Sequence, residues 1–246
     1  MAHRSQSGLS AAAVIDIWEQ GAGRHPLDRA LLLLRYTCPD EPFETLCEWT
    51  MGERDRRLLV SRRNTFGDRI DGYADCPACG NGLEFELSCE GVSGSASTTG
   101  ATWHRVEQAG RSWDMRGPNS LDLAAAAAAP DLDRARRVIL SRCMRSGTDM
   151  VDEAEWTDEL QAALAARLSE LDPLAEILID VRCAACGHAW QSVFDIADFF
   201  WNEIHVRSKR LLQEIDLLAR TYGWTEGEIL GMTDQRRSLY VGMALS

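Results

Sequence analysis

The chain has 246 residues, a hydrophobic fraction of 45% and a formal net charge of −12, values that suit one globular core or two small lobes. The acidic balance makes nucleic acid an unfavourable partner, because phosphates repel an acidic surface. No run approaches the roughly 20 apolar residues that cross a bilayer, and the N-terminus lacks the apolar stretch of a signal peptide. We therefore expect no membrane partner. Four of the eight cysteines form two Cys-x-x-Cys pairs and four are scattered, so we expect a reducing cytoplasm and not a disulfide-stabilised secreted protein.

Residues 1–67 have the pattern of a helical N-terminal region. Ser10 can cap a first helix, and Pro26 can open a second. Thr50 and Glu53 form a capping box for a third helix, which ends near Gly67. This third helix carries a cluster of basic residues: Arg54, Arg56, Arg57, Arg62 and Arg63. Because acidic residues are interleaved with them, we expect a solvated helix face rather than a nucleic-acid contact.

The pattern changes in residues 68–90, where two short strands flank a cysteine knuckle. A first strand is expected from Ile70 to Tyr73. Residues 83–87 alternate strictly between apolar and acidic, which is typical of a strand with one buried face. The knuckle between them is Cys76-Pro-Ala-Cys79-Gly. Residues 91–101 are small and polar, and they predict a loop or linker.

Residues 91–175 are predicted to form a mainly helical insertion. Two short strands are expected at its start, near Trp103–Val106 and Trp113–Arg116. Capping residues and proline positions then predict three helices: Leu121 to Pro130, Asp131 to Met144, and Asp158 to Leu171. The last of these places leucines at positions 160, 164, 168 and 171 on one stripe.

Residues 176–194 repeat the earlier knuckle and its flanking strands. The second knuckle is Cys183-Ala-Ala-Cys186-Gly, between strands at 177–181 and 190–194. The two knuckles together predict one zinc ribbon from two separate stretches, 68–90 and 176–194. Its metal ligands are predicted to be Cys76, Cys79, Cys183 and Cys186, holding one structural Zn²⁺ ion.

The chemistry of this ribbon favours a structural metal. The glycines after each knuckle, Gly80 and Gly187, permit the positive φ that turns backbone N–H groups toward sulfur. Two facing knuckles close a tetrahedron of thiolates and leave no position for water or substrate. A rubredoxin-like iron site is the alternative metal. A redox role for one pair would need a strand-to-helix setting, whereas strands flank both pairs. His188 could replace a cysteine but is expected to lie exposed.

Residues 195–246 predict C-terminal helices. The longest is capped by Asp195 and ended by Gly223, and Thr225 and Thr233 can cap two more. One helical face cannot bury three consecutive aromatic residues, so some of them pack on another lobe or on a partner. The candidate partner-binding residues are Phe199, Phe200, Trp201 and Trp224.

These elements predict an α+β, mostly helical fold around a four-cysteine zinc ribbon. We find no nucleophile motif, no glycine-rich phosphate loop and no paired-carboxylate signature in the sequence. The chain is therefore predicted not to be an enzyme and to have no small-molecule substrate. An enzyme on a zinc-stapled scaffold would need a deep polar pocket with perturbed acids.

Three stretches resemble a known family: His25–Leu33, Gly52–Leu59, and the run from the second knuckle through Phe194 to Glu226. Together they resemble the T4-like phage baseplate protein family of contractile tails and related bacterial contractile injection systems. The resemblance covers the N-terminal and C-terminal thirds of the chain. It implies a role in baseplate or hub assembly, as a stable part or as an assembly chaperone, for a chain whose knuckles predict a structural zinc ion.

The partners implied are baseplate or hub proteins of a contractile tail-like particle, and the location is the bacterial cytoplasm or the assembled particle. The competing hypothesis is a zinc-ribbon adaptor protein of transcription or RNA metabolism. Basic residues beside the knuckles would favour that hypothesis, and only Arg182 lies close to one.

Overall fold

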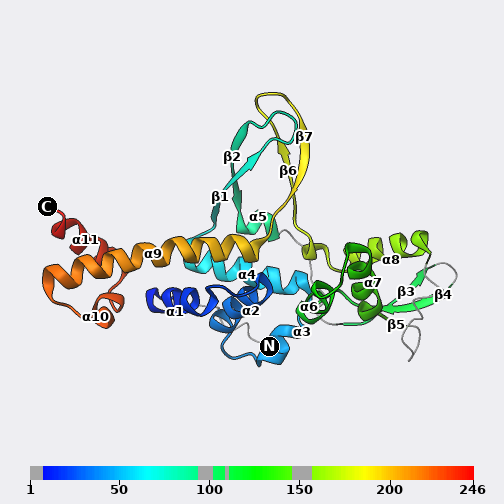
Figure 1. The fold of residues 1–246 in the computed structure, drawn as a ribbon, viewed down its shortest axis with the longest axis horizontal. Helices are drawn as coiled ribbons and strands as arrows, with labels where there is room; N and C mark the ends of the chain where they lie inside the picture. The colour runs from blue at the N-terminus through cyan, green and yellow to red at the C-terminus, as the bar shows by residue number, and fades with distance from the viewer. Residues whose placement is uncertain (1–7, 94–101, 109–110, 146–156) are drawn as a thin grey trace.

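The computed structural model describes residues 8–93, 102–108, 111–145 and 157–246. Over these residues the chain is mostly helical, with small antiparallel sheets, so the predicted α+β and mostly helical class is confirmed in that coarse form. Figure 1 shows a helical body, a second lobe at one end of it, and a slender arm that projects from the body between them.

The helical body combines the N-terminal helices with the long C-terminal helix. Its helices are α1 (Ala11–Gly21), α2 (Pro26–Thr37), α3 (Phe43–Glu48), α4 (Met51–Phe66) and α9 (Ile196–Tyr222). The side chains of Ser10 and Thr50 accept hydrogen bonds from backbone N–H groups of the first turns of α1 and α4, and Pro26 opens α2. These predicted helix starts are confirmed, whereas the short helix α3 was not foreseen.

The aromatic run of α9 lies in the core of this body. Phe200 is completely buried and packs edge-on against Phe66 of α4, with ring centroids 5.9 Å apart. Trp201 is 5% exposed and packs beneath Arg29 of α2. The predicted partner-binding role of Phe200 and Trp201 is therefore wrong. Helices contact α9 from several directions, so adjacent side chains are buried without a partner.

Two arginines of α4 differ from the expectation of a solvated helix face, whereas Arg63 is exposed as expected. Arg54 and Arg62 are 4% and 3% exposed. Arg62 donates two hydrogen bonds to Glu203 of α9, at 2.9 and 2.6 Å, and Arg54 donates to Asp55 at 2.6 Å. A buried guanidinium needs such partners. Arg62 therefore joins α4 to α9, and the buried Arg54 is paired within α4.

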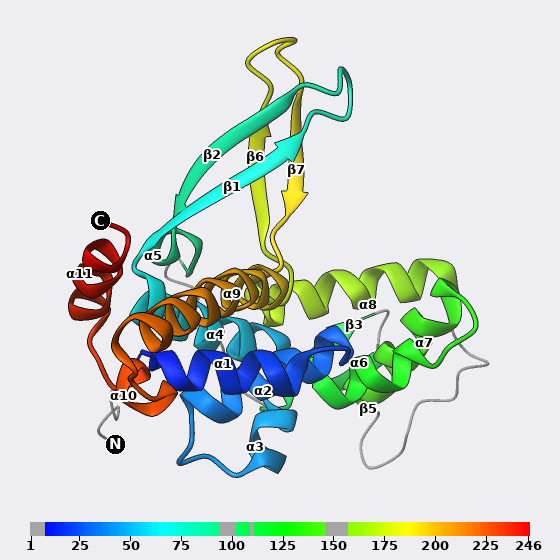
Figure 2. The same cartoon turned by 60° about the vertical axis from the view of Figure 1, so that its left-hand side comes forward.

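The arm consists of two hairpins that stand side by side (Figures 1 and 2). The first pairs β1 (Arg69–Asp75) with β2 (Gly82–Ser88), and the second pairs β6 (Leu178–Arg182) with β7 (Ala189–Val193). The alternation predicted for β2 is present, but its apolar side chains are only half-buried. The expected buried face is absent from β2 because the arm is too thin to enclose one.

Short helical segments connect the arm to its surroundings. Helix α5 (Cys89–Ser93) follows β2, so the start of the loop predicted for 91–101 is helical, and residues 94–101 lie outside the described residues. A 3-10 helix, Pro173–Ala175, leads into β6. The base of the arm is thus attached at both hairpins to the helical body.

The second lobe has a sheet and helices of its own: β3 (His104–Gln108), β4 (Arg111–Met115), β5 (Met144–Arg145), α6 (Ser120–Ala127), α7 (Leu132–Cys143) and α8 (Asp158–Leu171). The strands pair in the order β3-β4-β5. Met144 belongs to β5, so the helix predicted to run through it ends one residue earlier. A separate core fills the lobe, with Trp113, Met115 and Cys143 almost completely buried.

The C-terminal helices end and begin where their capping residues predict. Gly223 ends α9 with a φ of 70°. Thr225 and Glu228 form a reciprocal capping box for α10 (Glu226–Leu230), and Thr233 caps α11 (Asp234–Ala244). Among the residues that the structure describes, none of the helices combines the length and apolar character needed to span a bilayer.

Candidate metal centre

The tip of the arm brings together four cysteines from the two hairpins: Cys76, Cys79, Cys183 and Cys186. Their sulfur atoms all lie within 4.8 Å of one another. The sulfur–sulfur distance is 3.7 Å from Cys76 to Cys186 and 3.7 Å from Cys79 to Cys183. Four thiolates at ~2.3 Å from a tetrahedral zinc would be about 3.8 Å apart, whereas a disulfide bond is ~2.0 Å long. The spacing therefore fits ligands around a shared ion, and the cluster can hold a metal.

The two knuckles have equivalent backbone hydrogen bonds, at a constant offset in the sequence. In the first, the Cys76 N–H donates to the carbonyl of Asn81 at 2.9 Å. In the second, the Cys183 N–H donates to the carbonyl of His188 at 2.8 Å. The strand pairs continue this equivalence, because the pair nearest each knuckle is Asp75 with Gly82 and Arg182 with Ala189. The short internal repeat seen in the sequence is thus a repeat of structure.

The sulfur contacts follow the same relationship. Exchanging each knuckle for its equivalent converts the Cys76–Cys186 contact into the Cys183–Cys79 contact, and both measure 3.7 Å. Gly80 and Gly187 both have a positive φ, of 71° and 77°, as the knuckle pattern predicts. Glycine adopts this conformation without steric cost. The cluster therefore has a local two-fold arrangement with one knuckle contributing each half.

Hydrogen bonding shifts the pKa values of two of the thiols, Cys79 and Cys183, in opposite directions. Backbone N–H groups, first that of Cys186 and then that of Ala185, lower the pKa of the Cys183 thiol to about 7. The Asn81 N–H also lowers the pKa of Cys79, but hydrogen bonds shared with the other sulfurs raise it to about 12. Four thiolates this close repel one another without a cation. A bound metal ion would take the place of the remaining protons.

The cluster is accessible from one side. Cys76 and Cys183 are 2% and 1% exposed, whereas Cys79 and Cys186 lie at the surface of the tip. His188 is also exposed and stacks on Trp190, with ring centroids 5.9 Å apart. The cysteines therefore form the cluster without the histidine, and an ion could enter from the tip of the arm.

The remaining cysteines lie elsewhere and are buried: Cys38, Cys47, Cys89 and Cys143. Cys89 accepts a weak contact from Arg62 at 3.6 Å. Burial raises the pKa of both Cys89 and Cys143, so these side chains stay protonated and behave as small apolar groups.

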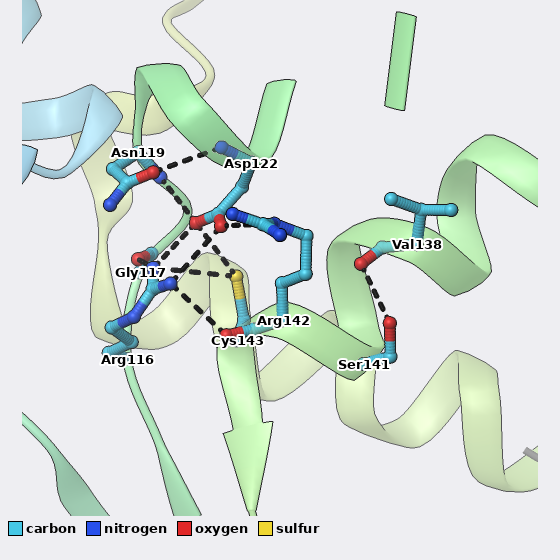
Figure 3. A network of polar contacts seen from close by, with 8 residues as sticks. All are labelled: Arg116, Gly117, Asn119, Asp122, Val138, Ser141, Arg142 and Cys143. Atoms are coloured by element: carbon cyan, nitrogen blue, oxygen red, sulfur yellow. Dashed lines mark hydrogen bonds and ion pairs between the residues drawn. The ribbon is translucent and has the colours of Figure 1, made fainter. Parts of the chain in front are cut away.

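A second polar cluster joins α6 to α7 in the second lobe (Figure 3). The completely buried Asp122 carboxylate accepts hydrogen bonds from Arg116 at 2.5 and 3.1 Å and from Arg142 at 2.8 Å. It also accepts one from the Asn119 N–H at 3.0 Å. Burial alone would raise the pKa of Asp122, but the Arg116 and Asn119 hydrogen bonds hold it below its usual value.

This cluster was not foreseen, and we interpret it as structural. The Asn119-x-x-Asp122 spacing is a local capping signal, but nothing local indicates that arginines from two other elements converge on the same carboxylate. Each charge has a partner within the cluster, which is the condition for burying an ion pair without a large penalty. The cluster therefore fixes α6 on α7.

Of the predicted partner-binding residues, two reach the surface. Phe199 is half-buried, with Arg62 over its ring. Trp224 is half-buried between Tyr222 and Tyr240, with ring centroids 4.5 and 4.7 Å away. Phe199 lies in the first turn of α9 and Trp224 lies just beyond its C-terminal end, so the four residues do not form one surface.

Comparison with known proteins adds no assignment to these observations. No protein family, no curated protein and no solved structure matches this chain. The cysteine cluster and the arm that carries it are therefore the features from which a function must be inferred.

Proposed function

We propose that the cysteine cluster binds one structural zinc ion and that the arm is a zinc ribbon. Sulfur–sulfur distances of 3.7 Å match the edge of a zinc–thiolate tetrahedron. Four thiolates are ligands that both zinc and iron accept. We favour zinc because a metal that only stabilises the fold needs no redox chemistry. The reducing cytoplasm that we expect for the chain would also keep the four cysteines as thiols, available to bind it. The metal content of the purified chain distinguishes the two.

We further propose that the metal has no catalytic role. A catalytic zinc has three protein ligands and an open position for water or substrate. Here four sulfurs from one chain lie within 4.8 Å of one another and would complete the tetrahedron. The ion would then act on the shape of the arm and not on a substrate.

The function we propose is a non-enzymatic part in baseplate or hub assembly of a phage-tail-like contractile injection system. The observation that carries it is the arm, which projects from the helical body and ends in the metal cluster (Figures 1 and 2). A rigid projection suits a protein that contacts neighbours on more than one side. The resemblance to T4-like phage baseplate proteins supplies the kind of assembly. Two of its stretches lie mainly in α2 and α4, and the third runs into α9.

The zinc-ribbon adaptor of RNA metabolism or transcription is less well supported. The first hairpin carries one arginine among four acidic residues: Arg69, Asp71, Asp75, Glu84 and Glu86. The second hairpin is balanced, with Asp180 and Arg182. An arm with this charge repels a phosphate backbone. Salt-dependent binding of the chain to RNA or DNA would restore the adaptor hypothesis.

Two experiments test the proposal, the first for the metal and the second for the assembly role. Elemental analysis of the purified chain should find one zinc per chain, and Cys183→Ser should lose it. The matched control is Cys143→Ser, which removes a thiol outside the cluster and retains a hydroxyl that can donate to Asp122, as the thiol does at 3.7 Å.

Co-expression with the proteins of a contractile-tail baseplate should then recover a complex through an affinity tag on this chain. Failure of the zinc-loaded chain to bind any of these proteins, singly or in pairs, would refute the assembly role and leave the metal site standing. A chain that binds them but contains no metal would refute the zinc site alone.

A further inference from the structure

A groove in the second lobe lies between α7 and α8, far from the metal cluster. Its volume is about 620 Å³. Apolar side chains of both helices line it: Ile139, Leu140, Ala162, Ala165 and Leu168. Ala162 and Ala165 line the groove and are exposed to solvent. Small residues at these positions would let another helix approach closely, so the groove has the shape of a helix-binding site.

The two sides of the groove carry opposite charges. Four charged residues of α7 and α8 line the groove: Asp133, Arg136, Arg137 and Asp158. On the α7 side, Asp133, Arg136 and Arg137 give a net charge of +1, with Arg136 paired to Asp133 at 3.4 Å, and Asp158 gives the α8 side a charge of −1. A basic edge and an acidic edge therefore run along one apolar floor.

We propose that this groove is the interface of a symmetric dimer, in which the α7–α8 pair of one copy packs into the groove of a second copy. In a two-fold interface, each surface element meets the complementary element of the same surface. The basic α7 edge of one copy then faces the acidic α8 edge of the other, and the reverse contact forms at the same time. The result is a four-helix arrangement with its apolar floor enclosed.

Charge selects a second copy over other occupants. The chain as a whole has a net charge of −12, so most of its faces repel another copy. The α7–α8 face is nearly neutral and has both signs, which removes that repulsion at this one place. A uniformly acidic or uniformly basic partner helix would satisfy one edge and oppose the other. Helices α7 and α8, which line the groove, lie away from the tip of the arm in Figure 1, so pairing leaves the metal cluster accessible.

Sedimentation equilibrium of the full-length, metal-loaded chain tests the proposal. The wild type should dimerise, and either charge reversal, Arg137→Glu or Asp158→Arg, should raise the dissociation constant at least about tenfold, because each places like charges across the interface. The double variant Arg137→Glu/Asp158→Arg exchanges the two edges within one chain. It should dimerise about as well as the wild type, because opposite charges again face each other.

A second pair of variants tests the apolar floor. Ala165→Glu should abolish the dimer, because it places a carboxylate in the enclosed groove. Ala166→Glu is the matched control: it makes the same change at an exposed position of α8 outside the groove, and its dimer should be unchanged. Circular dichroism verifies that every variant retains its helices. A wild type that is monomeric at all concentrations overturns the proposal. So does a double variant that dimerises no better than the single reversals.

Discussion

Removing the metal should unfold the arm and leave the rest of the chain folded. The perturbation is a zinc chelator or the variant Cys183→Ser. In the strands of the arm beyond its base, Val181 is the apolar side chain, other than the knuckle cysteines, that is less than a tenth exposed. Burying one valine contributes roughly 2 kcal/mol. Zinc binding contributes roughly 10–16 kcal/mol in small zinc domains. The metal therefore outweighs the burial of this valine roughly five- to eightfold, and the other apolar side chains of these strands beyond the base are half-buried or exposed.

The helical body depends on the metal far less. Its core contains Leu33, Leu34, Leu58 and Phe200, all completely buried, and these side chains remain enclosed when the arm opens. The second lobe has its own core around Trp113. Unfolding should consequently be local, since separate cores can open independently of one another.

Hydrogen exchange measured by mass spectrometry resolves the two regions. After chelation, amides of β1, β2, β6 and β7 should exchange at rates that approach those of an unfolded chain, while amides of α2, α4 and α9 keep their protection. Cys143→Ser should exchange like the wild type in the arm. If the four strands remain protected without metal, or if α4 and α9 lose protection in the same step, the reasoning about separate stability is wrong.

Three further substitutions concern the stability of the second lobe, the body and the C-terminal helix α11. Asp122→Asn should lower the unfolding free energy by about 3 kcal/mol, because Arg116 and Arg142 lose a buried anionic partner. The pKa of Asp122 is depressed in the fold, so its contribution is present above the unfolded value of about 3.9 and is lost as the pH falls through the folded value. Denaturant titrations should therefore show the difference from wild type shrinking at acidic pH; a difference that grows there would contradict this assignment. Gly52→Ala should destabilise the chain, because a Cβ would lie 1.9 Å from a carboxylate oxygen of Asp172. Gly242→Ala, where nothing lies within 4 Å, should stabilise it by about 0.5–1 kcal/mol; equal melting temperatures for the two variants would refute this contrast.

The helix boundaries and the knuckles were predictable because their signals are local. Asp131 and Thr157 cap α7 and α8 by accepting hydrogen bonds from N–H groups three residues later, and such spacing is visible in the sequence. The cysteine knuckles combine a fixed spacing with a glycine, and the pattern occurs twice. The repeat predicts that the four sulfurs come together. It does not predict that they do so at the tip of an arm that projects from the helical body.

The buried charges were not predictable because their partners are far away in the sequence. Arg62 and Glu203 are 141 positions apart, and Gly52 and Asp172 are 120 apart. Without those partners, an arginine-rich helix resembles a solvated face. The same limitation affects α9: hydrophobic periodicity identifies one stripe, but it cannot reveal that neighbouring helices cover the flanking positions, including Trp201.

The base of the arm is held by a device that does not involve the metal. The buried Arg62 guanidinium donates to the carbonyl of Gly67, just before β1, at 2.8 Å and contacts the Cys89 sulfur, just after β2. It also binds Glu203 of α9, the helix that follows β7. One side chain thus connects both ends of the first hairpin to the exit of the second. Because the bases are fixed here and the tips would be fixed by the ion, two hairpins with little apolar packing can stand away from the body without splaying. A projection held at its base by Arg62 and at its tip by an ion would be rigid along its length, as the proposed assembly role requires.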